Sequence, residues 1–204
     1  MILSSYSSDS LSSGSRSLTG HRELSRKRSG LRAGCVGLPV FMGSKFVFMD
    51  ARAEVMIRST SDAPWLPSGG RAEVIRSLVA PKPASIVRLL LRRGNTVFCV
   101  RRDGVGKLDL PMRKVPPADQ DGLATARQLA FHVFGKRTSV TPIGFVRNVV
   151  LDPAADYEWP VPFAHFTLWA ADGEPVSAGT WISTGDSKSS LSDRHWFPLI
   201  EAQD

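Results

Sequence analysis

The sequence is poor in the residues that cross-link secreted domains and in the long apolar runs that span membranes. It holds two cysteines among 204 residues, Cys35 and Cys99, and no C-x-x-C motif. This usage excludes a disulfide scaffold and suits a reducing compartment, so we expect unpaired thiols and a cytoplasmic protein. The longest apolar region, residues 36–57, contains four charged side chains and is therefore too polar to cross a bilayer.

Basic runs interleaved with aromatic residues are also absent from the sequence, which disfavours sequence-specific nucleic-acid binding. The net charge of +7 is spread along the chain: residues 1–55 hold eight Lys/Arg and four Asp/Glu, and residues 56–204 hold 18 and 15. The longer part is thus only mildly basic, and it suits an anionic small molecule as a partner as readily as nucleic acid.

Serine and arginine are abundant in the first 34 residues, where Asp9 and Glu23 are the only acids. Such a composition buries too little apolar surface to offset the entropy of ordering, so residues 1–55 are interpreted as a low-complexity, disordered extension. Two alternatives are an organellar transit peptide, which would place the protein in an organelle, and upstream sequence ahead of a true start at Met49 or Met56. Within the extension, residues 40–49 are predicted to pair as a small hairpin.

The rest of the chain predicts one folded domain over residues 85–204, preceded by a linker over residues 56–84. The linker is expected to contain a short helix over residues 71–80, ended by Pro81. Extended apolar patterns predict strands, of which the first two form a hairpin. These strands are expected over residues 86–91, 96–100, 139–151, 161–171 and 180–182.

The stretch 110–135, LPMRKVPPADQDGLATARQLAFHVFG, organises this domain. It predicts a loop, a turn rich in proline and aspartate, and then one amphipathic helix. At about 100° per residue, the core-facing side chains share one arc of that helix. They are Leu123, Ala126, Leu129, Ala130, Val133 and Phe134. Arg127, Gln128, Phe131 and His132 lie off the arc and are expected to be exposed.

This stretch resembles the Nudix box, G-x5-E-x7-R-E-U-x-E-E-x-G-U, where U is a bulky aliphatic residue, usually set in an LPGGKVEPGE-like run. The LP and KV pairs match at residues 110–111 and 114–115, and Arg127 and Leu129 fall on the R and the first U without a gap. Residues 195–199, HWFPL, resemble the W-x-P-L ending of the family. The resemblance covers residues ~85–200 and implies an α/β (α+β) fold, a Nudix-type α/β/α sandwich with a mixed β-sheet.

The resemblance also implies hydrolysis of a nucleoside diphosphate linked to another moiety, with glutamates on one helical face holding Mg2+ through hard oxygen ligands. In this sequence Arg113 replaces the signature glycine and Asp119 replaces the first glutamate. The other three glutamates are replaced by Gln128, Phe131 and His132. A neutral imidazole prefers softer metals and phenylalanine offers no ligand, so we expect no tight Mg2+ site.

The leading hypothesis is therefore a Nudix-like pseudoenzyme without Mg2+-dependent pyrophosphohydrolase activity. It would bind a nucleotide or another diphosphate-containing small molecule, or a protein partner. The candidate ligand-binding residues are Arg101, Arg102, Arg113, Lys114, Arg127, Gln128 and Phe131.

The alternative is a diverged but active Nudix hydrolase, in which Mg2+ would be held at Asp119. Asp119 and His132 would then be its catalytic residues, aided by the acidic loop over residues 152–158. Each candidate also has a structural interpretation, because Asp119 suits a helix cap and Arg127 could pair with Asp119 or Asp121.

Overall fold

The computed structural model describes residues 54–185 and 189–201, all of which belong to one structural unit. Residues 1–53 of the predicted extension, including the hairpin over residues 40–49, lie outside the described residues, whereas Val55 at its end opens the first strand of the sheet. Among the described helices, none combines the length and the apolar character that crossing a membrane requires.

The main sheet has six strands, and all neighbouring pairs are antiparallel except β3 and β9, which are parallel. The sheet is therefore mixed. In spatial order its strands are β1 (Val55–Ser61), β2 (Arg71–Arg76), β8 (Thr141–Val149), β9 (Phe163–Ala170), β3 (Ala84–Leu90) and β7 (Met112–Lys114).

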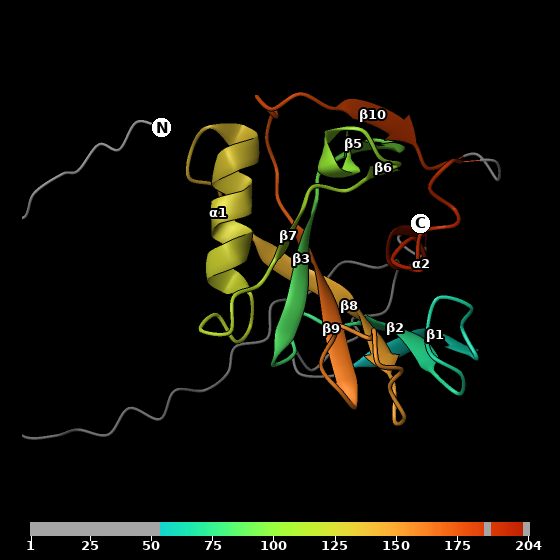
Figure 1. Cartoon of the computed structure of the whole chain (residues 1–204). Helices are drawn as coiled ribbons and strands as arrows, with labels where there is room; N and C mark the ends of the chain where they lie inside the picture. Colours follow the sequence, from blue (N-terminus) through green and yellow to red (C-terminus); the bar gives the residue numbers. More distant parts are fainter. Residues whose placement is uncertain (1–53, 186–188, 202–204) are drawn as a thin grey trace, which may run out of the picture. The chain divides into compact units, whose positions relative to one another are not determined.

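A smaller sheet joins β10 (Thr180–Ser183), β5 (Thr96–Arg101) and β4 (Arg92–Arg93), and β6 (Leu108–Asp109) also pairs with β5. The helices are a 3-10 turn η1 (Arg102–Gly104), α1 (Leu123–Phe134) and the four-residue α2 (Pro198–Glu201). In Figure 1, α1 and α2 lie on opposite sides of the strands.

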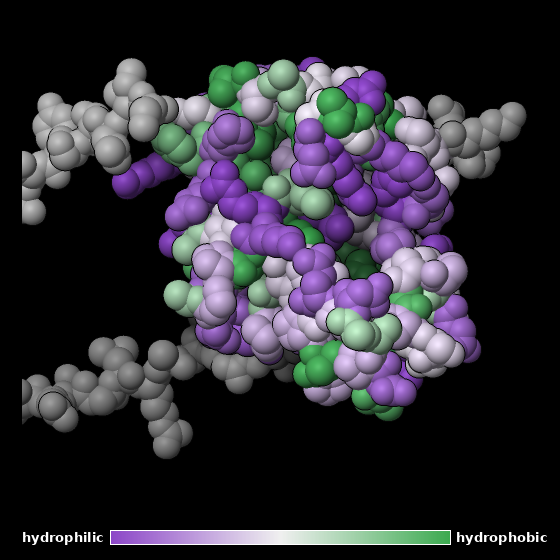
Figure 2. All heavy atoms as spheres, in the orientation of Figure 1, coloured by the Kyte–Doolittle hydropathy of each residue, from purple (hydrophilic) through white to green (hydrophobic). Residues whose placement is uncertain are grey.

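Alternation of side chains along β3 divides the core into two layers. Val87 and Leu89 pack with the buried face of α1, whereas Leu90 packs with Leu199 and Ile200 of α2. Each fully buried side chain of this kind contributes about 1.5–3 kcal/mol, so both layers stabilise the sheet. Figure 2 shows the hydrophobic residues on the viewed face as separate patches among hydrophilic ones.

The mixed-sheet α+β fold class is confirmed, and so is the amphipathic helix of residues 110–135. The residues predicted to face the core on α1 are buried, apart from Leu123, which is partly buried against the same cluster. The second helical layer is the four-residue α2.

The predicted helix over residues 71–80 is wrong, because residues 71–76 form β2 between β1 and β8. Residues 72–75 are all buried, so this strand is covered on both faces. A short, fully buried strand has no period-two pattern, and periodicity alone cannot separate it from a buried helical segment. Within the segment predicted as a linker, residues 56–61 and 71–76 therefore belong to the sheet.

The predicted hairpin of residues 86–100 is also only partly correct. The two-residue β4 pairs with β5, but β3 itself pairs with β7 and β9. The chain passes from the main sheet to the smaller one at Leu91, whose carbonyl accepts the Phe98 amide at 3.1 Å.

Candidate functional site

Helix α1 begins after a turn that Asp119 holds in place. The Asp119 carboxylate accepts hydrogen bonds from the Ala124 and Thr125 amides at 3.3 and 2.7 Å, and from the Thr125 hydroxyl at 2.7 Å. Burial acts to raise the pKa of Asp119, but these hydrogen bonds outweigh it and hold the pKa below its ordinary value. The oxygens of Asp119 are thus engaged at the start of the helix.

Replacing Asp119 with alanine is expected to lower the free energy of unfolding by about 1–2 kcal/mol, because the amides at the helix start lose their acceptor. Urea denaturation measures the change. The control is Asp172→Ala, at an exposed acid, which is expected to change stability by less than about 0.5 kcal/mol. A variant that kept its stability but lost a measurable hydrolase activity would support the diverged enzyme instead.

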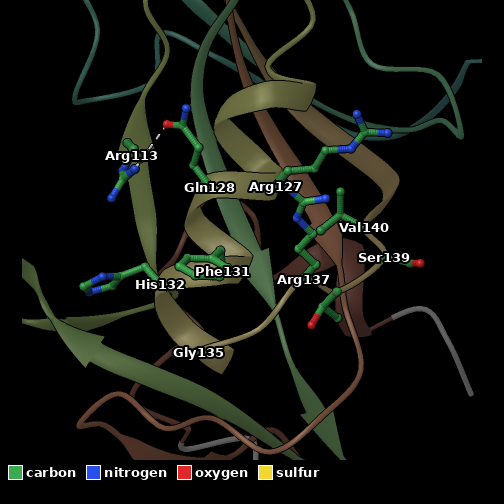
Figure 3. A pocket seen from close by; sticks show the side chains of 10 residues that line it. Arg113, Arg127, Gln128, Phe131, His132, Gly135, Arg137, Ser139 and Val140 are labelled. Atoms are coloured by element: carbon green, nitrogen blue, oxygen red, sulfur yellow. Dashed lines mark hydrogen bonds between the residues drawn. The ribbon is translucent and has the colours of Figure 1, made fainter.

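The exposed face of α1 lines an open groove of about 1190 Å3, here called the α1 groove. Its lining includes Arg113, Arg127, Gln128, Phe131 and His132, all of them predicted site residues. Figure 3 shows Gln128 directed toward Arg113 of β7, whereas Arg127 points away from that pair. The Arg113 Nη1 donates to Gln128 Oε1 at 3.5 Å.

Arg127 has neither an ion pair nor a hydrogen bond within the described part of the chain, so its predicted structural pairing with Asp119 or Asp121 is not found. The Asp119 carboxylate bonds Thr125 in the first turn of α1, whereas His132 lies in its last turn, about 10 Å further along the axis at 1.5 Å per residue. The two candidate catalytic residues therefore do not form one constellation.

The other cationic candidates, Arg101, Arg102 and Lys114, do not line the α1 groove. For Lys114 the reason is that successive residues of a strand face opposite sides of the sheet. Arg113 faces the α1 groove, whereas Lys114 pairs with Glu158 at 2.8 Å and lies 5.1 Å from the centre of the Trp159 ring. Arg102 pairs with Asp109, and Arg101 Nη1 donates to the Gly106 carbonyl at 3.4 Å. The structure thus divides the predicted basic group between two faces.

A second cavity of about 390 Å3, here called the sheet-face pocket, lies on the face of β3, β8 and β9 away from α1. Its size falls in the range of pockets that hold small molecules. Aromatic rings and polar side chains both contribute to its wall. The aromatic residues are Trp65, Tyr157, Trp159, Phe166, His195 and Trp196; the charged and amide residues are Arg88, Arg102, Asn148, Asp156 and Glu158.

Arg88 reaches this pocket from the middle of β3. Its Nε is buried without a hydrogen-bond partner among the described residues, and its Cζ lies 6.0 Å from the centre of the Phe166 ring. Burial lowers the pKa of Arg88; the field of Asp109 opposes this shift and that of Arg102 adds to it. A buried cation that lacks hydrogen-bond acceptors is costly, so this side chain requires an explanation.

Asp109 is the anion beneath the pocket, and its side chain is fully buried. It accepts hydrogen bonds from Arg102 Nε at 2.9 Å, from the Trp196 indole at 2.8 Å and from the Leu110 amide at 2.8 Å. Burial acts to raise the pKa of Asp109, but the field of Arg88 and the bonds from Arg102 and Trp196 outweigh it and lower the pKa. The Asp109 carboxylate therefore forms hydrogen bonds with Arg102 and attracts the Arg88 guanidinium electrostatically.

The mouth of the pocket carries a stacked pair of rings, Trp65 and His195, with centroids 3.7 Å apart and planes inclined by 17°. Burial lowers the pKa of His195, and the fields of Arg88 and Arg102 act in the same direction. A neutral imidazole stacked on an indole forms a flat aromatic edge beside the two arginines.

The residues present do not fit a Mg2+ site on the exposed face of α1. The Asp119 oxygens serve the helix start, and the α1 groove is lined by Arg113, Arg127 and Arg137. Within residues 54–185 and 189–201, no three His, Cys, Asp or Glu side chains are grouped as metal ligands. Hard divalent cations require several oxygen ligands, which this face does not offer.

Sequence reasoning missed Arg88, Asp109 and the Trp65–His195 pair. A signal for Arg88 was present, since it is the one charged residue in the apolar run SIVRLLL. Its significance depends on Asp109 and Trp196, which are far along the chain and meet it only in the folded sheet.

Compared with known proteins, the chain matches no protein-family model and no curated protein. Seven chains of solved structures match it. One is a crystal structure of the Bacillus subtilis pyrophosphohydrolase BsRppH in a point-mutant form, with 13% sequence identity and a TM-score of 0.44. The match covers 70% of this chain and 87% of that one.

Proposed function

We propose that this domain binds a nucleotide or another small molecule with a diphosphate group in the sheet-face pocket, and that it does not hydrolyse the ligand. One observation carries the proposal: the partly buried Arg88 side chain lines this pocket, and its Nε is buried with no acceptor among the described residues. An anionic ligand would supply the missing acceptors and the missing negative charge.

Charge supports an anionic ligand at the inner end of the pocket. Arg88 and Arg102 both lie near Asp109, so this end carries two cations and one carboxylate. The acids Asp156 and Glu158 are exposed at the outer loop, and Glu158 is already paired with Lys114. A phosphate oxygen accepting from Arg88 would therefore meet a net positive field.

The aromatic wall supports a ligand that also carries a planar ring. Trp159 and Phe166 are in edge contact, with centroids 5.2 Å apart, and the Trp65–His195 stack also lines the pocket. Rings of this kind contribute stacking energy with little loss of conformational entropy. A nucleoside joined to phosphate groups would stack on the rings through its base and accept hydrogen bonds from the arginines through its phosphates.

Two observations support binding without hydrolysis. The carboxylates that line the sheet-face pocket are Asp156 and Glu158, of which Glu158 is paired with Lys114, and α1 supplies no carboxylate to the groove on the other face. Metal-assisted attack on a diphosphate needs carboxylate oxygens that hold the cation and activate water. At the corresponding positions this chain carries Gln128, Phe131 and His132, and the surrounding groove is lined by arginines. The arrangement supports a binding role.

The proposal is tested by a thermal-shift series with ADP-ribose, ADP and adenosine in the presence of Mg2+. At a ligand concentration of about 100 times Kd, a bound ligand stabilises the fold by about 2.7 kcal/mol. We expect ADP-ribose and ADP to raise the melting temperature and adenosine to have little effect, because adenosine lacks the phosphates that Arg88 requires. Chromatography of the same samples should recover the ligands intact, and accumulation of AMP from ADP-ribose would identify the diverged hydrolase instead.

A further inference from the structure

The α1 groove is a cationic surface that the small-molecule pocket does not account for. Arg113, Arg127 and Arg137 line it, and no carboxylate is among its lining residues. Within the described residues, none of these three arginines is paired with an acid. The groove therefore attracts anions, and its charge is not used by the fold itself.

Phe131 gives this cationic surface an apolar centre. Its side chain is 54% exposed, although it sits on a helix whose opposite face is fully packed against β3. Packing of the core does not require an aromatic residue at position 131, since Ala126, Ala130 and Val133 supply the core contacts. An exposed aromatic ring among arginines suits a partner that carries both acidic and apolar side chains.

The groove also adjoins a free sheet edge. β7 is the last strand of the six-stranded sheet; among the described strands it pairs with β3 alone, and all three of its residues are exposed. An edge strand presents unpaired backbone N–H and C=O groups that another extended chain can complete. Because Arg113 belongs to β7 and lines the α1 groove, the edge and the cationic surface are continuous.

We infer that the α1 groove and the outer edge of β7 dock an acidic peptide segment of a partner protein. The peptide lies extended along β7, its carboxylates meet the arginines, and one large apolar side chain packs on Phe131. A peptide is favoured over a nucleic acid because a peptide backbone completes the hydrogen bonds of a sheet edge and a phosphodiester backbone does not. This interaction is separate from the sheet-face pocket, which opens on the other face of the sheet.

The test uses fluorescence anisotropy of a labelled peptide, EDLEFDED, with the full-length protein. We expect saturable binding that weakens as salt rises, because the contacts between exposed charges are screened. Arg127→Glu and Arg137→Glu should each weaken binding by about tenfold or more, and Phe131→Ala by about fivefold. All three positions are exposed, so the variants are expected to keep the melting temperature of the parent.

The control is Lys107→Glu, which makes the same change of charge at an exposed loop position away from the groove. It should alter peptide binding by less than about twofold, as expected for a charge outside the interface.

The inference is overturned if the peptide does not bind, or if Lys107→Glu weakens binding as much as Arg127→Glu. Tighter binding of a uridine 12-mer, or an Arg127-dependent dimer in sedimentation, would also overturn it by assigning the groove to RNA or to a second copy. Binding of ADP-ribose should remain unchanged in Arg127→Glu, so the outcome is independent of the proposed function.

Discussion

Replacing Arg88 with methionine is expected to weaken ADP-ribose binding by about 30-fold or more, which corresponds to roughly 2 kcal/mol for loss of a buried charged partner. Methionine keeps much of the length and apolar volume of the arginine stem, so the aromatic wall around Phe166 stays supported. The same change removes a buried cation whose Nε has no acceptor. We expect the unliganded variant to unfold at a temperature close to that of the parent, because the lost attraction to Asp109 and the relieved cost of the unpartnered Nε oppose each other.

The matched control is Arg58→Met, which makes the same change at an exposed arginine of β1 that pairs loosely with Glu201 at 3.7 Å. It should leave ADP-ribose binding unaltered, and its effect on stability should stay below about 1 kcal/mol. Calorimetric titration and thermal unfolding measure both properties for each variant. Unimpaired ligand binding by Arg88→Met would contradict the role given to Arg88.

Replacing Asp109 with asparagine is expected to lower the free energy of unfolding by about 1–3 kcal/mol, because the buried side chain loses its charge while the partly exposed Arg102 can turn to solvent. The loss leaves Arg102 and Arg88 without their shared anion. An asparagine oxygen can still accept from the Trp196 indole, but its amide would then present N–H groups to the Arg102 guanidinium. The control Asp193→Asn changes an exposed acid that pairs with Arg194 at 2.9 Å, and its cost should stay below about 1 kcal/mol.

The lowered pKa of Asp109 also makes stability depend on pH. Because the folded-state pKa lies below the unfolded value of about 3.9, the contribution of Asp109 is fully present above that pH and is lost as pH falls through the folded-state pKa. Urea denaturation between pH 7 and pH 3 should therefore show a steeper acid loss for the parent than for Asp109→Asn. Parallel curves would show that Asp109 does not titrate as its surroundings imply.

The fold was predictable where periodicity is strong. The core-facing positions of α1 recur at helical spacing, and the strands around Val146 and Leu168 carry the β-branched and aromatic residues that sheets favour. β2 was not predictable in this way, because a strand buried on both faces lacks alternation. The place where β3 leaves the main sheet depends on contacts with β7 and β9, which local patterns do not encode.

The candidate site was predictable in part. The helical wheel of α1 predicted that Phe131 is exposed, and it lines the α1 groove. Arg113 reaches the same groove from β7, a strand where the sequence predicted a loop. The sheet-face pocket was not predicted, because its members come from segments far apart in the chain. Asp109 and Trp196 are 87 residues apart, and only the closed sheet brings both of them near Arg88.

The central claim, that this domain binds a diphosphate ligand without cleaving it, is tested most directly by titrating ADP-ribose into the protein calorimetrically with Mg2+ present. We expect heat that saturates at one ligand per chain, and ADP-ribose recovered unchanged afterwards. A persistent heat of reaction with AMP and ribose 5-phosphate as products would contradict the claim. So would the absence of any binding heat for ADP-ribose and ADP alike.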